Sequence, residues 1–143
     1  MKETPPVPRR QDFKVLRPMP TRWSDNDQYG HVNNVAYYSY FDSAVNAYLI
    51  EAAGIDTRAL PAIGIVAETG CRYLKELSFP DTLFVGLRLE RLGNSSVTYQ
   101  LAVFRADDNE PAAVGRFVHV YVDQENRRPT AIPAVIRAAL AHL

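Results

Sequence analysis

The feature that most constrains the fold is the segment from Asn34 to Ala53, in which only Asp42 and Glu51 carry charge. Its apolar residues recur at helical spacing and extend around most of the cylinder. A helix that is apolar on most sides is a buried helix, so the rest of the chain must wrap it. The apolar stripe comprises Val35, Tyr38, Phe41, Val45, Leu49 and Ala52; the narrow polar stripe comprises Ser39, Asp42, Ser43 and Asn46.

Most of the remaining chain alternates with the period of two that is typical of strands. One long helix and five strands joined by short turns do not give a βαβ pattern. They predict an α+β fold in which an antiparallel sheet wraps the helix, and exposed sheet edges favour dimerisation. We expect strands over Phe13–Arg22, Ile63–Leu77, Leu83–Glu90, Val97–Val103 and Phe117–Val122, and a short terminal helix over Pro133–Leu143.

The bulk properties narrow the class of protein. A chain of 143 residues favours one domain, which we place at residues 12–143 after a flexible arm at residues 1–11. A net charge of zero argues against nucleic acid as a partner, and no apolar run reaches the roughly 18 residues that span a bilayer. The single cysteine, Cys71, excludes an intrachain disulfide and fits a reducing cytoplasm.

The chain shows no pattern that indicates a metal or a cofactor. Its three histidines and one cysteine lack the spacing of zinc ligands. It has no Gly-x-Gly-x-x-Gly run for a dinucleotide. His119 alternates with valines, which predicts a place in the core or in an interface.

A dense polar run precedes the helix. Between Arg22 and Asn34 the chain carries Asp25, Asp27, a Gly30-His31 pair and two adjacent asparagines. Such a run places carboxylates and an imidazole at a helix N-terminus, where free N–H groups and a partial positive charge are found. A base that faces N–H donors is the minimal equipment for attacking a carbonyl.

This run resembles a motif of the hotdog-fold thioesterases, specifically the 4-hydroxybenzoyl-CoA thioesterase-like group of acyl-CoA thioesterases. The matching residues are Arg22-x-x-Asp25-x-Asp27-x-x-Gly30-His31-Val32-Asn33-Asn34-x-x-Tyr37, followed by Tyr40-Phe41. The likeness continues through Leu74 to Leu77, Asp81 and the Leu87 to Ser96 hairpin, and covers roughly residues 13 to 140. It implies a curved five-stranded sheet around one long helix, paired into homodimers or homotetramers with active sites at the subunit interface.

The resemblance also implies roles for single residues. Asp27 stands where the family has its catalytic carboxylate, a general base or a nucleophile. The oxyanion donor is a backbone N–H at the helix start, which falls near Asn34, and His31 assists. Asn33, Tyr37, Asp42 and Arg72 are the expected substrate-binding residues.

Each of these residues also has a purely structural interpretation. Asp27 could cap a turn, and Asp25 could orient Arg22 or His31 or form an Asx turn. Asn33 and Asn34 are good N-cap residues, which is compatible with a backbone oxyanion donor. Asp42 lies where a second branch of hotdog thioesterases has its catalytic Glu, but it could equally bond to a neighbouring strand or subunit.

Taken together, the resemblance implies an acyl-CoA thioesterase that releases a free acid and CoA without a cofactor. Its substrate would be a thioester of CoA or of acyl carrier protein. Two alternatives stay open: a non-catalytic acyl-thioester binding or regulatory protein, and a hotdog enoyl-thioester hydratase.

Overall fold

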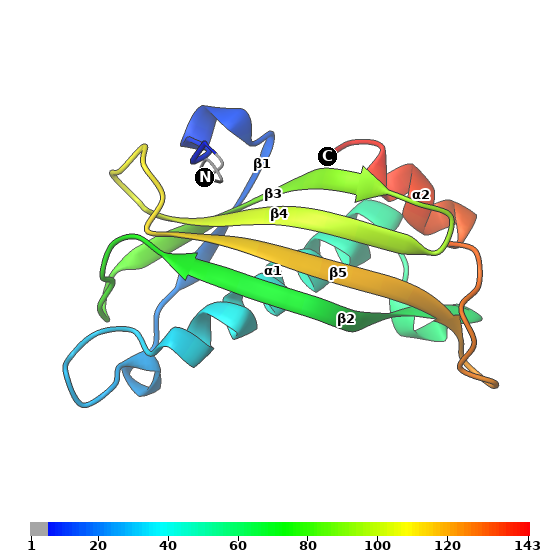
Figure 1. Cartoon of the computed structure of the whole chain (residues 1–143), viewed down its shortest axis with the longest axis horizontal. Coiled ribbons are helices and arrows are strands. Elements are labelled where there is room, and N and C mark those ends of the chain that lie inside the picture. Colours follow the sequence, from blue (N-terminus) through cyan, green and yellow to red (C-terminus); the bar gives the residue numbers. More distant parts are fainter. Residues whose placement is uncertain (1–5) are drawn as a thin grey trace, which may run out of the picture.

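The computed structural model describes residues 6–143 and contains five strands and one long helix (Figure 1). Strand β1 (Val15–Pro20) precedes helix α1 (Asn34–Ala53), and β2 (Ala62–Tyr73) follows it. The strands β3 (Thr82–Leu92), β4 (Ser96–Arg105) and β5 (Ala113–Asp123) come next, and helix α2 (Ala134–Leu140) ends the chain. Three short 3₁₀ helices, η1 (Arg10–Asp12), η2 (Trp23–Asp25) and η3 (Thr57–Ala59), lie between these elements.

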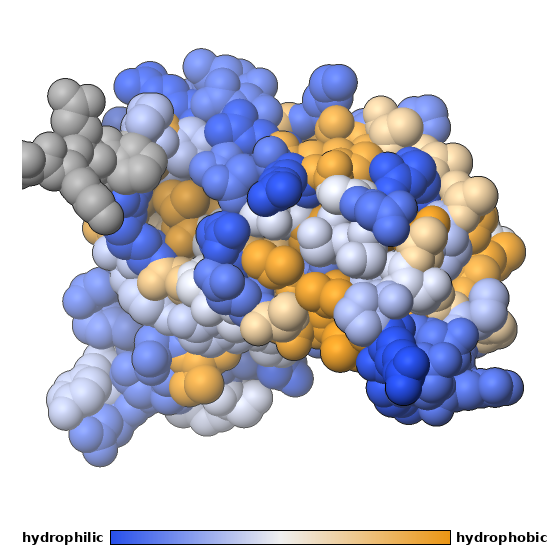
Figure 2. Space-filling view, turned by 45° about the vertical axis from the view of Figure 1, so that its right-hand side comes forward, coloured by the Kyte–Doolittle hydropathy of each residue, from blue (hydrophilic) through white to orange (hydrophobic). Residues whose placement is uncertain are grey.

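All five strands form one antiparallel sheet in the order β1-β3-β4-β5-β2. The sheet curves around α1, which runs along one face (Figure 1). The predicted α+β hotdog fold is therefore confirmed. Strands β1 and β2 are the two edges. Figure 2 shows hydrophobic surface lying between groups of hydrophilic residues on the side of the molecule it presents.

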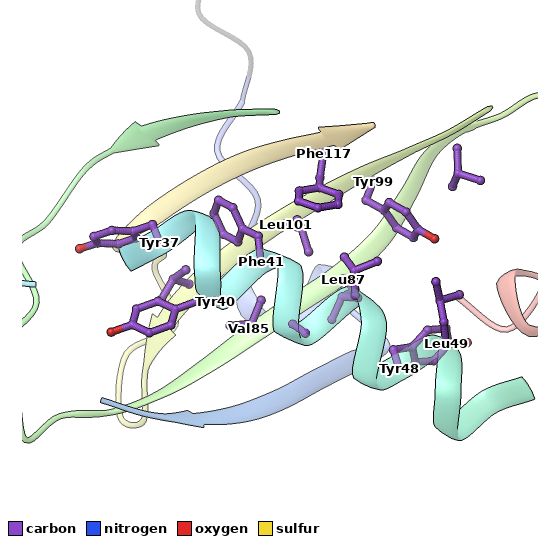
Figure 3. Close-up of a cluster of buried hydrophobic side chains, with 14 of the residues drawn as sticks. Tyr37, Tyr40, Phe41, Tyr48, Leu49, Val85, Leu87, Tyr99, Leu101 and Phe117 are labelled. Atoms are coloured by element: carbon purple, nitrogen blue, oxygen red, sulfur yellow. The ribbon is translucent and has the colours of Figure 1, made fainter. Parts of the chain in front are cut away.

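The core lies between α1 and the sheet. Figure 3 shows Phe41 and Leu49 of the helix among strand residues such as Leu87 and Leu101, all of which are fully or almost fully buried. Gly115 of β5 makes room for the Phe41 ring, because a Cβ atom there would lie 2.5 Å from Phe41 Cζ. Close packing of this kind fixes the helix on the sheet, and with it the position of the helix N-terminus.

The helix is less buried than the sequence suggests. Its buried residues are Tyr37, Tyr40, Phe41, Ala44, Val45, Tyr48 and Leu49. The expected apolar stripe is wrong at its two ends, since Val35 is 63% exposed and Ala52 is also exposed. The sheet covers one side of the helix only, so an apolar residue at either end can extend beyond it.

The boundaries of the strands differ by a few residues from those expected from the sequence. The second strand ends at Tyr73 rather than Leu77, and the first covers only Val15–Pro20. The flexible arm stays a prediction. Residues 1–5 of it lie outside the described residues, while Arg10 packs on the Phe84 ring and donates to the carbonyl oxygen of Asp108.

Candidate active site

The polar run forms a tight loop in front of α1. Asn26 and Val32 pair as an isolated β-bridge, and Asp27 N–H donates to the His31 carbonyl oxygen at 2.8 Å. Gly30 turns the loop with a φ of 80°, a left-handed conformation that glycine adopts without strain. Val32 N–H donates to the Leu77 carbonyl oxygen, so the loop is fixed to the segment that precedes β3.

Asp27 presents its carboxylate in an asymmetric way. Oδ1 accepts hydrogen bonds from the N–H groups of Tyr29 at 2.9 Å and His31 at 3.3 Å. Within residues 6–143 no donor reaches Oδ2. One oxygen therefore orients the group, as in an Asx turn, while the other is free to take a proton or to attack a substrate.

The helix N-terminus leaves one N–H group free next to this carboxylate. Asn33 is the N-cap, and its Oδ1 accepts from Val35 N–H at 3.1 Å. The Asn33 carbonyl oxygen accepts from Ala36 N–H. Asn34 N–H has no acceptor in the described chain, and it is the first donor of the helix, where the macrodipole is positive. Asn33 thus caps the helix as predicted, and Asn34 offers its backbone rather than its side chain.

Asp27 and Asn34 line the same pocket, which has a volume of about 230 Å³. Tyr73 closes one side of it, and its hydroxyl donates to the Asn34 carbonyl oxygen at 2.9 Å. Tyr37 packs edge-on against Tyr73, with the ring centroids 5.0 Å apart, and burial raises the pKa of Tyr37 to about 12. The full lining is Asp27, His31, Val32, Asn34, Tyr37, Tyr73, Lys75, Glu76 and Leu77.

His31 lines the pocket but is not bonded to Asp27 through its ring. Its Nε2 lies 3.1 Å from Glu76 Oε2, and the side chain is partly exposed. His31 contacts Asp27 through its backbone only: its carbonyl oxygen accepts from Asp27 N–H, and its N–H donates to Asp27 Oδ1. His31 is therefore held at the mouth of the pocket, with its ring shared between solvent and Glu76.

Asp25 has a different environment from Asp27, although only one residue separates them. It is 4% exposed, and its Oδ2 accepts from Tyr40 hydroxyl at 2.7 Å and from Arg22 N–H at 2.8 Å. Burial raises the pKa of this carboxyl, but the bonds from Arg22 and Tyr40 outweigh burial and leave the pKa below its ordinary value. Asp25 orients Arg22 and not His31, and it connects the loop to α1.

Three of the predicted substrate-binding residues do not line this pocket. Asn33 is the N-cap, and its side chain is bonded to Val35 N–H. Asp42 is exposed on α1 and accepts a hydrogen bond from Asn46 Nδ2 at 3.1 Å. Arg72 is exposed on β2 and lines a different cavity, of about 380 Å³. Asp42 is close to the motif in sequence but α1 carries it away from the pocket, whereas Arg72 directly precedes Tyr73, which does line the pocket.

Sequence reasoning missed the far wall of the pocket. Tyr73 ends β2, and Glu76 and Leu77 follow it, more than thirty residues after the motif. The bonds from Val32 N–H to Leu77 and from the Tyr73 hydroxyl to Asn34 hold this segment at the pocket. The family-like stretch from Leu74 to Leu77 was the one signal for this wall. A long-range contact of this kind has no local pattern of its own.

Within residues 6–143, no three or more His, Cys, Asp or Glu side chains gather in a way that could hold a metal ion. No helix in this part of the chain combines the length and the hydropathy needed to cross a membrane.

Known proteins resemble the chain over nearly its whole length. The sequence profile of the thioesterase-like superfamily matches residues 21–140. The PA5185 protein of Pseudomonas aeruginosa is 51% identical over 96% of each chain, and its crystal structure superposes with a TM-score of 0.92. A Thermus thermophilus thioesterase crystallised with coenzyme A and zinc is 31% identical over 90% of this chain and 98% of its own, with a TM-score of 0.74. The chloroplastic acyl-acyl carrier protein thioesterase ATL3 of Arabidopsis thaliana is 26% identical over 119 residues, which are 81% of this chain and 62% of ATL3.

Proposed function

The chain belongs to the thioesterase-like superfamily and is a thioester hydrolase, and we propose that it hydrolyses an acyl-CoA thioester to the free acid and CoA. One observation carries this proposal: Asp27, which has a free carboxylate oxygen, and Asn34, which has a free N–H group, line a single pocket. The Thermus thermophilus relative holds coenzyme A, and ATL3 acts on acyl carrier protein thioesters. We take CoA as the carrier and keep acyl carrier protein as the alternative.

Asp27 is the proposed general base. Its Oδ2 takes a proton from water as the water oxygen adds to the thioester carbonyl carbon. The negative charge that develops on the carbonyl oxygen is stabilised by Asn34 N–H and by the positive end of α1. The carbon–sulfur bond then breaks, and the thiolate leaves with little acid assistance, because a thiol pKa lies near 8.5.

Asp27 could instead act as the nucleophile. Its carboxylate would then add to the carbonyl carbon, expel the thiolate and form a mixed anhydride that water hydrolyses in a second step. Both routes need the same free oxygen and the same oxyanion donor. His31 assists in either by fixing Asp27 through its N–H group. Asn33 holds the helix N-terminus in place as the N-cap, and Tyr37 lines the pocket around the acyl carbonyl.

The protein is proposed to act as a homodimer, or as a homotetramer built from such dimers, joined through β2. This edge strand pairs with β5 on one side, and no strand of residues 6–143 pairs with its other side. Ile65 and Val66 are 44% and 47% exposed within a run, Ile65–Thr69, that is exposed throughout. An open apolar edge of this kind favours pairing with a second copy.

A two-fold pair through β2 also gives Asp42 and Arg72 a route to substrate. Asn46, to which Asp42 is bonded, lines a cavity together with Ala62 and Gly64 at the start of β2. The polar stripe of α1 therefore lies towards the β2 edge, where the second subunit would sit. We propose that Asp42 and Arg72 contribute to the partner's substrate site rather than to their own.

The test is a panel of acyl-CoAs with detection of free thiol. Hydrolysis releases thiol in step with loss of the thioester, whereas a binding protein gives tight binding without thiol release. A hydratase would change the absorbance of an enoyl-CoA while the thioester stays intact. Absence of thiol release from every acyl-CoA and acyl carrier protein thioester in the panel would refute the proposed function.

A further inference from the structure

A second cavity, of about 290 Å³, lies at the other end of α1. Asn46 and Leu49 of the helix form one wall, and Gly64 and His119 of the sheet form another. From Asn34 to Asn46 the helix rises about 18 Å at 1.5 Å per residue. The two cavities have no residue in common, so this one is not the pocket of Asp27 in the same protomer.

Two buried polar atoms beside this cavity have no hydrogen-bond partner in the described chain. They are His119 Nδ1 and the Tyr99 hydroxyl, whose rings meet edge-on with centroids 5.8 Å apart. His119 is 2% exposed. Since buried polar groups are almost always paired, His119, which also lines the cavity, indicates a ligand that completes its hydrogen bonding.

The cavity has a definite chemistry. Burial lowers the pKa of His119 to about 4, so the ring is neutral at pH 7 and carries one donor and one acceptor nitrogen. Gly64 keeps space beside it, because a Cβ atom there would lie 3.2 Å from His119 Nδ1. The other walls combine apolar residues such as Leu49 and Ile136 with the polar residues Asn46, Thr57, Arg58 and Gln124. An apolar body that carries a hydrogen-bonding group at its end fits such a lining.

The cavity has room for the end of an acyl group. Its volume of about 290 Å³ is many times the roughly 10–15 Å³ that one water molecule needs. A short acyl chain or one aromatic ring therefore fits in it.

The proposed dimer brings this cavity next to the partner's reaction centre. A two-fold antiparallel pair centred on Ala67, the middle of the exposed run of β2, sets Pro61 opposite the partner subunit's Tyr73. Tyr73 is the residue whose hydroxyl bonds the Asn34 carbonyl oxygen. Gly64 then lies about 10 Å further along the strand, at 3.3 Å per residue.

We propose that the His119 cavity of one subunit receives the distal end of the acyl group whose thioester lies at the partner's Asn34. His119 is then a specificity-determining residue. It selects acyl groups that carry a hydroxyl or similar hydrogen-bonding group at their distal end. This inference rests on the proposed thioester hydrolysis and on the pairing through β2.

The first experiment compares matched acyl-CoAs by thiol release. The pairs are hexanoyl-CoA with its ω-hydroxy derivative and phenylacetyl-CoA with its para-hydroxy derivative. We expect the wild type to favour the hydroxylated member by about tenfold in kcat/KM, the size expected of one hydrogen bond. His119→Phe keeps a ring of similar size and should reduce this preference to within about twofold. Tyr99→Phe removes the other unpaired polar atom. Because residue 99 does not line the cavity, this variant should keep the preference for the hydroxylated acyl-CoA.

The second experiment tests whether the two residues belong to different subunits. Refolding Asp27→Asn chains together with His119→Phe chains gives mixed dimers with one fully wild-type site, if each site uses Asp27 of one subunit and His119 of the other. Thiol release by the mixture should then regain part of the wild-type preference for the hydroxylated member, because the remaining His119→Phe homodimers release thiol without it.

The outcomes of these experiments distinguish a failure of the His119 proposal from a failure of the proposed thioester hydrolysis. Thiol release without a hydroxyl preference, or with a preference that survives His119→Phe, overturns the inference and leaves thioester hydrolysis standing. Loss of the preference in His119→Phe without its recovery in mixed dimers overturns the placement across subunits. If the wild type releases no thiol at all, the proposed function fails and the inference falls with it.

Discussion

Replacing Asp25 with Asn should destabilise the protein much more than the same change at Asp27. Asp25 is buried and accepts from Tyr40 hydroxyl, from Arg22 N–H and from the Arg22 guanidinium. An amide retains one acceptor oxygen but turns an NH₂ group towards the remaining donors. Bonds to a buried charged acceptor contribute about 1.5–3 kcal/mol each, so we expect a loss of about 2–4 kcal/mol of unfolding free energy.

The pH dependence gives an independent check on this reasoning. The pKa of Asp25 in the folded state lies below its ordinary value, because the bonds from Arg22 and Tyr40 outweigh burial. A lowered pKa contributes stability that is present above the unfolded value, near 3.9, and is lost as the pH falls through the folded value. The gap between wild type and Asp25→Asn should therefore be widest at neutral pH and should narrow below about pH 4.

The assay is urea unfolding of wild type, Asp25→Asn and Asp27→Asn at one protomer concentration, since an oligomer's stability depends on concentration. In thermal unfolding at pH 7, the same loss of unfolding free energy corresponds to a fall in Tm of about 6–12 °C for a domain of this size. Asp27→Asn should stay near wild type, because the amide oxygen can still accept from Tyr29 and His31. Equal midpoints for Asp25→Asn and wild type at pH 7 would refute the assignment of Asp25 as a structural anchor.

Three further outcomes follow from the structure. Asn34→Ser keeps the free N–H and should retain most turnover, whereas Asn34→Pro removes it and should lower kcat by about 10²–10³-fold. Both variants should fold, because Pro suits the first helical position and Asn33 already has the extended ψ of 139° that a following proline requires. Equal kcat values for the two variants would mean that the oxyanion is stabilised elsewhere. Gly115→Ala should lower the free energy of unfolding in urea by about 1–3 kcal/mol, because its Cβ would lie 2.5 Å from Phe41 Cζ. The control Gly70→Ala should leave this free energy nearly unchanged, because no atom lies within 4 Å of the added Cβ. Similar unfolding midpoints for the two variants would refute the packing argument. Light scattering at micromolar concentration should give a mass of at least twice the 16.1 kDa of one chain. Val66→Lys places a charge on the exposed edge of β2 and should shift the protein towards monomer. A wild type that is only monomeric would refute the pairing through β2.

Much of the fold could be predicted because its signals are local. The apolar segment after Asn34 and the alternating strands specify a helix and a sheet by periodicity alone. Gly54 ends the helix in a left-handed conformation with a φ of 70°, the conformation for which glycine is preferred at a helix C-terminus. Val35 was placed in the core by its spacing, but it is exposed, because periodicity does not reveal where the covering sheet ends.

The site could be predicted in part. Asp27, His31, Asn34 and Tyr37 lie close in sequence, and the structure does bring them to one pocket. The sequence offered no means to separate the buried Asp25 from Asp27, since that difference depends on Tyr40, fifteen residues away on the helix.

The part of the site that escaped prediction depends on contacts distant in sequence. Tyr73 reaches the helix N-terminus only because β2 returns along the sheet edge. Arg72, its neighbour in the strand, points to another cavity because successive side chains of a strand face opposite sides. His119 was expected in the core or an interface and is buried, but its unpaired Nδ1 is visible only in three dimensions.

The central claim, that the Asp27 carboxylate performs the reaction, is tested most directly by the rate of thiol release from Asp27→Asn at saturating acyl-CoA. The change keeps the acceptor for Tyr29 and His31 and removes only the basic oxygen, so the loop should persist. We predict a fall in kcat of about 10²–10⁴-fold with an unchanged unfolding midpoint, while Asp42→Asn keeps kcat within about tenfold. Wild-type turnover by folded Asp27→Asn would contradict the account and make Asp42 the leading candidate.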